Sequence, residues 1–170
     1  MCNGVKIITV SGSCSGVGKT TVAEELLKKL RGWSALKVTV LHHGNCPINR
    51  DCGACENLNS KFSIISDKKI IQEKGKDTQR LKKAGAKQVL WLKAKPEGLM
   101  IGLKQALFKM KGAKGVIIEG TSALKYLKPD LAIFVKKENS TFPASRHSGI
   151  SPNILGEMRE KRSAREIFKK

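Results

Sequence analysis

The chain contains few acidic and few aromatic residues. Only 14 of its 170 residues are Asp or Glu, against 33 Lys or Arg, which gives a net charge of +19. A charge of this sign attracts polyanions, including nucleotides, acidic proteins and nucleic acids. Aromatic residues make up only 5%, so the stacking platforms of single-strand binders are scarce. Nucleic-acid binding is therefore disfavoured as the main function, and a lysine-rich solvated surface accounts for the same charge.

Long hydrophobic runs are also absent. The longest are four or five residues, as at 131–135, whereas a helix that crosses a bilayer needs about 20. The sequence passes directly from Met1 into an apolar segment at 5–10, and we expect no signal peptide. We therefore expect one cytoplasmic domain over residues 1–170 with no membrane contact. Five cysteines in such a chain do not indicate a disulfide framework.

Apolar segments alternate with helical patterns along the chain. We predict strands at 5–10, 36–41, 87–92, 115–119 and 130–135, and helices at 19–31, 77–84 and 96–111. Strands separated by helices of this length indicate crossover connections and a mostly parallel sheet. The prediction is a three-layer α/β fold with an insertion at 43–73, formed by a cysteine-bearing loop and a small hairpin whose strands are 62–65 and 69–72. An amphipathic C-terminal helix is predicted at 152–170.

A glycine-rich segment lies between the first predicted strand and helix. It consists of Gly12, Ser13, Cys14, Ser15, Gly16, Val17, Gly18, Lys19, Thr20 and Thr21. A loop of this composition can aim several backbone N–H groups at phosphate oxygens, next to the positive end of a helix. Lys19 would reach the β- and γ-phosphates, Thr20 would ligate Mg²⁺, and Thr21 would contact the α-phosphate. The segment predicts the P-loop NTPase form of the α/β fold and a purine nucleoside triphosphate, GTP or ATP, as ligand.

The loop departs from the strict P-loop spacing. Its first glycine, Gly12, lies one residue earlier than the usual position. The pattern Gly-x-x-x-Gly-Val-Gly-Lys-Thr resembles the loop of dethiobiotin synthetase and its relatives.

An acidic residue follows another buried-type strand. Glu119 closes the run Val-Ile-Ile-Glu-Gly at 116–120. Because carboxylates at the carboxyl ends of parallel strands face the ligand crevice, Glu119 is predicted to hold Mg²⁺ together with Thr20. Lys19 and Glu119 are therefore the predicted catalytic residues. The sequence offers no identifiable general base, which is consistent with slow hydrolysis unless a partner completes the site.

Four segments together resemble the MobB-type molybdopterin-guanine dinucleotide biosynthesis proteins. They are the loop itself, the strand 38–41 leading into His42 and His43, the segment 75–80 (Gly-Lys-Asp-Thr-Gln-Arg) with Ala-Gly-Ala at 84–86, and 118–120. One departure is that this family has Lys-His after its second strand, where this chain has Leu-His-His.

The resemblance implies a dimeric, weak GTPase that requires Mg²⁺. It also implies a role as an adaptor in guanylylation of the molybdenum (or tungsten) cofactor, with molybdopterin cofactor and its nucleotidyltransferase as partners. On the same analogy, His43, Asp77 and Arg80 face the site. From the residues alone, Asp77 equally fits an N-cap of the helix 77–84 and Arg80 a surface cation.

Three cysteines fall within ten residues. Cys46, Cys52 and Cys55 have a C-x5-C-x2-C spacing, which suits Zn²⁺ or an iron–sulfur cluster. The fourth ligand would be His42, His43, Cys14 or a residue of a second subunit. Three unligated thiols are the alternative.

Two further functions fit the same residues. One is a small-molecule kinase or ATP-dependent ligase resembling dethiobiotin synthetase, with Lys37, Thr121 and Ser122 lining an acceptor pocket. The other is a metal- or redox-sensing nucleotide-binding protein. The choice between GTP and ATP is open because the Asn-Lys-x-Asp pattern is absent. Asn139 follows the last predicted strand and is a candidate contact for the base.

Overall fold

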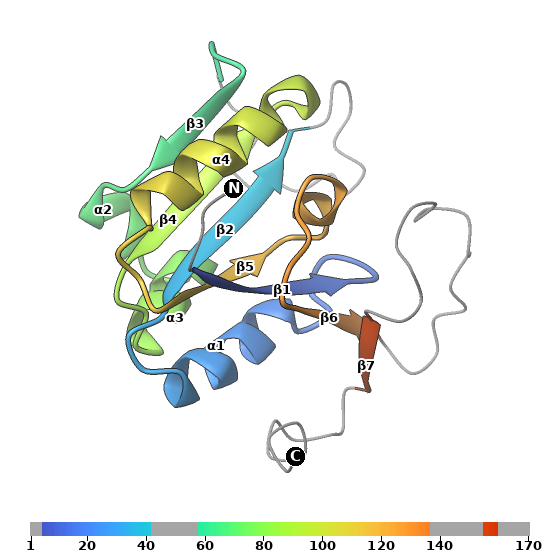
Figure 1. Cartoon of the computed structure of the whole chain (residues 1–170). Coiled ribbons are helices and arrows are strands. Elements are labelled where there is room, and N and C mark those ends of the chain that lie inside the picture. The colour runs from blue at the N-terminus through green and yellow to red at the C-terminus, as the bar shows by residue number, and fades with distance from the viewer. Residues whose placement is uncertain (1–4, 42–57, 137–154, 160–170) are drawn as a thin grey trace.

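The computed structural model describes residues 5–41, 58–136 and 155–159. Seven strands form one sheet in the order β3-β4-β2-β5-β1-β6-β7 (Figure 1). The strands are β1 (Lys6–Gly12), β2 (Ser34–Val40), β3 (Phe62–Ile65), β4 (Val89–Ala94), β5 (Gly115–Glu119), β6 (Leu131–Lys136) and β7 (Leu155–Arg159). All neighbouring pairs are parallel except β3 and β4, which are antiparallel. The predicted α/β fold with a mostly parallel sheet is confirmed.

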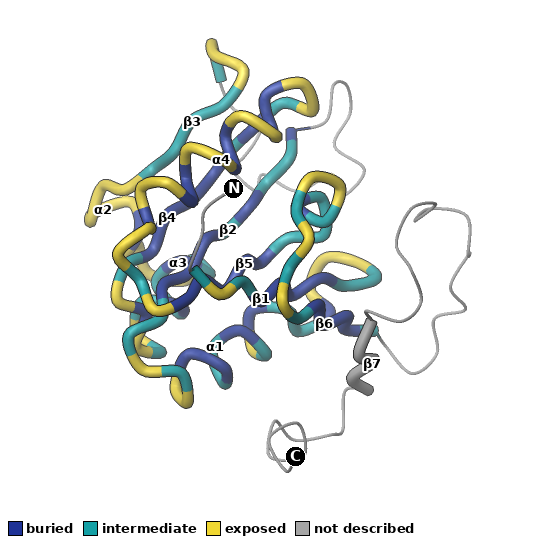
Figure 2. The backbone as a smooth tube through the Cα atoms, viewed as in Figure 1, coloured by how far each residue is buried: buried dark blue, intermediate teal, exposed yellow. Residues whose placement is uncertain are grey.

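Helices cover both faces of this sheet. They are α1 (Lys19–Lys29), α2 (Lys68–Ile71), α3 (Asp77–Lys83) and α4 (Leu99–Lys109), with short 3₁₀ turns η1 (Pro96–Gly98) and η2 (Thr121–Lys125). Helices α1 and α3 pack on one face and α4 on the other (Figure 1). Successive side chains of β5 point to opposite faces of the sheet. Ile117 packs in the core between the sheet and the helices α1 and α3, and Ile118 packs in the core beneath α4. Figure 2 shows buried residues along the central strands and exposed residues in the connections.

The spacing of apolar residues explains how α1 attaches to the sheet. Ala23, Leu26 and Leu27 are fully or almost fully buried, and they recur at the three- and four-residue intervals that place side chains on one helix face. Strand β5 is buried along its whole length, as expected for a parallel strand covered on both sides. These contacts fix the start of α1 beside the end of β5.

The predicted hairpin is wrong. Residues 68–71 form the one-turn helix α2, because the Asp67 carboxylate accepts hydrogen bonds from the backbone N–H groups of Lys69 and Ile70 and so caps a helix start. Strand β3 instead pairs with β4, with Ile64 opposite Leu92. The edge strand of the sheet on this side is therefore β3, which is antiparallel to β4 and distant from it in sequence.

The predicted C-terminal helix is also wrong where the structure describes it. Residues 155–159 form β7, which pairs in parallel with β6. The apolar residues in this segment have helical spacing, but Gly156 weakens a helix by about 1 kcal/mol. The edge of β6 provides backbone hydrogen-bonding groups that a strand can satisfy. None of the helices in the described part of the chain has the length and apolar character of a bilayer-spanning segment.

Gly120, directly after β5, is required by its surroundings. Its φ is +146°, and a Cβ built there would lie 2.9 Å from the Val38 carbonyl oxygen. Its N–H donates to the Val10 carbonyl at 3.1 Å, so the turn cannot move away without losing that bond. Both features hold the ends of β5, β2 and β1 together.

Gly120→Ala is therefore expected to lower the free energy of unfolding by about 1–3 kcal/mol. Urea denaturation followed by circular dichroism measures this change. Gly112→Ala is the matched control, because a Cβ at Gly112 meets no atom of the described residues within 4 Å. Equal stability of the Gly120→Ala and Gly112→Ala variants would contradict the packing argument.

Candidate functional site

Three adjacent parallel strands end at the same edge of the sheet. Strand β5 lies between β1 and β2, with Val10 opposite Glu119 and Lys37 opposite the same residue on the other side. The glycine-rich loop follows β1 at this edge and leads into α1. The carboxyl ends of parallel strands are where α/β proteins bind ligands.

The glycines of the loop are required by its path. Gly16 and Gly18 have φ of +75° and +100°, a region that other residues rarely adopt. A Cβ at Gly12 would lie 2.6 Å from the Val17 side chain. Val17 is fully buried, and the Ser13 N–H donates to the Val135 carbonyl at 3.0 Å. The loop is thus anchored on both sides, while Cys14 and Ser15 are exposed.

The Lys19 side chain folds back over this loop. Its Nζ donates to the Cys14 carbonyl oxygen at 2.6 Å. Burial lowers the pKa of this ammonium below its usual value, against the attraction of Glu119, which raises it. The ammonium of Lys19 therefore lies against the backbone of the loop.

Thr20 and Glu119 are in contact, as the predicted metal pair requires. The Thr20 hydroxyl donates to Glu119 Oε1 at 3.0 Å, which leaves the lone pairs of the hydroxyl available as ligands. Glu119 is only 4% exposed, and its Oε2 has no hydrogen-bond partner among the described residues. A buried carboxylate oxygen without a partner is rare. Oxygen ligands are those that Mg²⁺ prefers, so this pair fits the ion.

Lys37, which the sequence analysis named only as a possible lining residue of an acceptor pocket, lies between two carboxylates. Its Nζ donates to Glu119 Oε1 at 3.2 Å and also forms an ion pair with Asp77. Burial would lower the pKa of Lys37, but Glu119 and Asp77 outweigh it and raise that pKa above its usual value. A lysine inside the apolar strand Ser34–Val40 was the available signal, because a buried charge needs a partner.

Asp77 and Arg80 are brought to this site by α3. Asp77 is the first residue of α3, and the N-cap position is Lys76. Its carboxylate pairs with Lys37. Burial would raise the pKa of Asp77, but the hydrogen bond from Lys37 reverses this and lowers the pKa below its usual value. The N-cap alternative for Asp77 is thus wrong.

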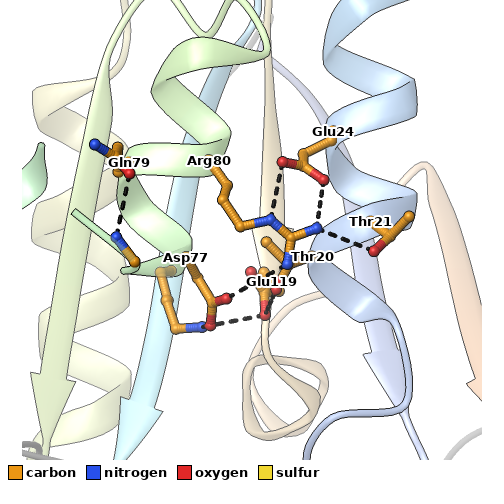
Figure 3. A network of polar contacts seen from close by, with 9 residues as sticks. Thr20, Thr21, Glu24, Asp77, Gln79, Arg80 and Glu119 are labelled. Carbon is orange, nitrogen blue, oxygen red and sulfur yellow. Dashed lines mark hydrogen bonds and ion pairs between the residues drawn. The ribbon is translucent and has the colours of Figure 1, made fainter. Parts of the chain in front are cut away.

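Arg80 is not a free surface cation. Its guanidinium binds both carboxylate oxygens of Glu24 on α1, at 2.6 and 3.0 Å, and donates to the Thr21 hydroxyl at 3.1 Å. Figure 3 shows Arg80 reaching from α3 to Glu24 and Thr21, with Asp77 beside Glu119. The hydrogen bond to Glu24 raises the pKa of Arg80. Glu24 was not predicted as a site residue, because it belongs to none of the motifs in the sequence.

Thr121 also contacts the loop. Its hydroxyl oxygen accepts from the Gly12 N–H at 3.3 Å, which ties the loop to the segment after β5. Several predicted residues lie outside the described residues: His42, His43, Cys46, Cys52, Cys55 and Asn139. Within the described ranges, no group of three or more His, Cys, Asp or Glu side chains is placed to hold a metal ion.

Arg80→Ala is expected to lower the free energy of unfolding by about 1 kcal/mol. The pair is bidentate and the Glu24 side chain is 19% exposed, but Arg80 itself is 42% exposed and screened by solvent. Thermal or urea unfolding measures the effect. Lys28→Ala, on the helix α1 that also carries Glu24, is the control, since it breaks an ion pair with Glu25 whose two side chains are 58% and 43% exposed. If Lys28→Ala lowers the free energy of unfolding as much as Arg80→Ala does, the Arg80–Glu24 pair is not the more stabilising of the two ion pairs.

The chain was also compared with known proteins. No protein-family model matches it, and no curated protein is significantly similar to it.

Proposed function

We propose that this chain binds a purine nucleoside triphosphate with Mg²⁺ at residues 12–21. The observation that carries the proposal is the contact between Thr20 and Glu119 beneath a glycine-rich loop, with a partnerless carboxylate oxygen. A glycine-rich turn that bound nothing would not need a buried acid at its base. An uncompensated buried polar atom costs about 1–3 kcal/mol, and a ligand would offset that cost.

The protein groups around the loop have separate roles in this proposal. The backbone N–H groups of the loop and of the first turn of α1 would bind phosphate oxygens. Lys19 would exchange the Cys14 carbonyl for the β- and γ-phosphates. Thr20 and Glu119 would hold Mg²⁺, which, when bound, offsets the negative charge of the phosphates.

The proposed hydrolysis is slow. An effective general base has a pKa near the working pH, whereas the pKa of Asp77 is lowered below its usual value. Asp77 is also ion-paired with Lys37, and Glu119 is assigned to the metal in this proposal, so neither acid is assigned as the general base. This supports a weak NTPase whose site a partner completes.

The finer assignment rests on the resemblance in sequence. GTP as the nucleotide, a dimer, and a role as adaptor in guanylylation of the molybdenum or tungsten cofactor are proposed on that basis. The segment 75–80, which discriminates the resemblance, contributes Asp77 and Arg80 to the site network. Zinc or an iron–sulfur cluster at Cys46, Cys52 and Cys55 is a further part of this proposal, outside the described residues.

Lys19→Ala is expected to weaken nucleotide binding about 10- to 100-fold, because charge-assisted hydrogen bonds to the phosphates are lost. Equilibrium titration with GTP and with ATP, in the presence of Mg²⁺, measures the affinity of each protein for each nucleotide. It also shows whether guanine or adenine is preferred. Lys104→Ala, at an exposed position of α4 on the other face of the sheet, controls for the loss of one positive charge. If the wild-type protein binds neither nucleotide, the proposed function is wrong.

Glu119→Gln is expected to abolish most of the gain in nucleotide affinity that Mg²⁺ provides. Glutamine has nearly the same shape but lacks the negative charge that holds the metal. The measurement is nucleotide affinity in EDTA and in excess Mg²⁺, for wild type and variant. Affinity in EDTA should stay within about threefold of wild type, since no phosphate contact is assigned to Glu119. If Mg²⁺ increases the nucleotide affinity of Glu119→Gln as much as that of the wild type, Glu119 is not the residue that holds the metal.

A further inference from the structure

We propose that Asp77 is a positioning residue that acts through Lys37: it holds the Lys37 ammonium on one oxygen of Glu119 and so keeps the other oxygen available for a hydrated divalent cation. This inference rests on the proposed function, since it concerns the same metal site. It assigns a purpose to an ion pair that nucleotide binding alone does not require.

The two oxygens of Glu119 are treated differently by the protein. Oε1 accepts from both the Thr20 hydroxyl, at 3.0 Å, and Lys37 Nζ, at 3.2 Å. Oε2 has no partner among the described residues, although the side chain is only 5% exposed. Two donors on one oxygen fix the orientation of the carboxylate. The second oxygen is thereby left as an acceptor for a ligand.

The Lys37 ammonium is the group that could occupy the second oxygen of Glu119, Oε2, in place of a ligand. An ammonium has three N–H donors on a flexible stem, so it can bind both oxygens of a neighbouring carboxylate. In this structure it is shared with Asp77. The side chain of Asp77 is 40% exposed and that of Glu119 is 5% exposed, so Asp77 draws the ammonium toward the solvent side of the site.

Asp77 is itself held in place by α3. Three residues along the helix, Arg80 binds Glu24 and Thr21 of α1, and its Nη1 lies 4.0 Å from Asp77 Oδ1. Contacts therefore run in a ring from Thr20 on α1 through Glu119, Lys37, Asp77 and Arg80 back to α1. Figure 3 shows Thr20, Glu119, Asp77 and Arg80 of this ring. In this proposal, the structural role of the segment 75–80 is to place Asp77 against Lys37.

A double-mutant cycle tests the proposal. Four proteins are compared: wild type, Asp77→Asn, Lys37→Met and the combined Asp77→Asn/Lys37→Met variant. The quantity measured is the metal coupling, defined as the nucleotide dissociation constant in EDTA divided by that in excess Mg²⁺. This ratio is insensitive to a general loss of stability, provided that each variant is folded by circular dichroism.

Asp77→Asn is expected to lower the metal coupling about tenfold, because the ammonium then pairs with both oxygens of Glu119 and competes with the cation. In the Lys37→Met background, the same substitution should change the coupling by less than about twofold, since the competitor is gone. Glu25→Gln, at an exposed acid of α1, controls for the loss of one negative charge and should leave the coupling unchanged.

Two results would overturn the inference. If Asp77→Asn lowers the coupling equally in both backgrounds, Asp77 acts directly by its charge and not through Lys37. If it has no effect in either background, Asp77 does not position the site. Asp77→Ser and Lys37→Gln are the second variants in case the first ones do not fold, with the same expected outcomes.

The cycle also separates this inference from the proposed function. Absence of nucleotide binding in the wild-type protein would overturn both. Nucleotide binding with metal coupling that Asp77→Asn leaves intact would overturn only the role of Asp77.

Discussion

The buried carboxylate of Glu119 is the constraint around which the other polar residues are arranged. A carboxylate that is 4% exposed is stable only if it is paired and hydrogen-bonded. Because β5 lies between β1 and β2, those partners come from both sides: Thr20 follows β1, and Lys37 lies on β2. Lys37 is partly buried in turn and takes a second acid from α3. One buried charge thus connects four elements of the fold.

Much of the local structure was predictable from sequence. The loop, the helix after it and the strand ending in Glu119 are continuous patterns, in which glycine spacing and apolar periodicity are expressed within a few residues. The pairing of Lys37 with two carboxylates was not predictable from the sequence. Its partners Asp77 and Glu119 are 40 and 82 residues away in sequence, and their proximity depends on strand order, which no local pattern specifies.

The two wrong predictions of strands and helices concern the edges of the sheet. Segments 62–65 and 155–159 form the outermost strands, β3 and β7, and each was assigned by its own periodicity or by the turn next to it. An edge strand is selected by the unsatisfied backbone groups of its neighbour, so β4 and β6 determined the outcome. Tertiary pairing of this kind overrides local propensity, as it commonly does in short segments.

The position of β1 has a consequence for how the chain reaches its native state. Its two sheet neighbours, β5 and β6, begin at Gly115 and Leu131, more than a hundred residues later. During synthesis the first strand has no sheet partner until most of the polypeptide has left the ribosome. Long-range pairing slows folding because the loop entropy is lost before the contacts form. Nascent chains that stop before residue 115 would carry the whole glycine-rich sequence but would lack Glu119, the acid that Thr20 contacts in the folded chain.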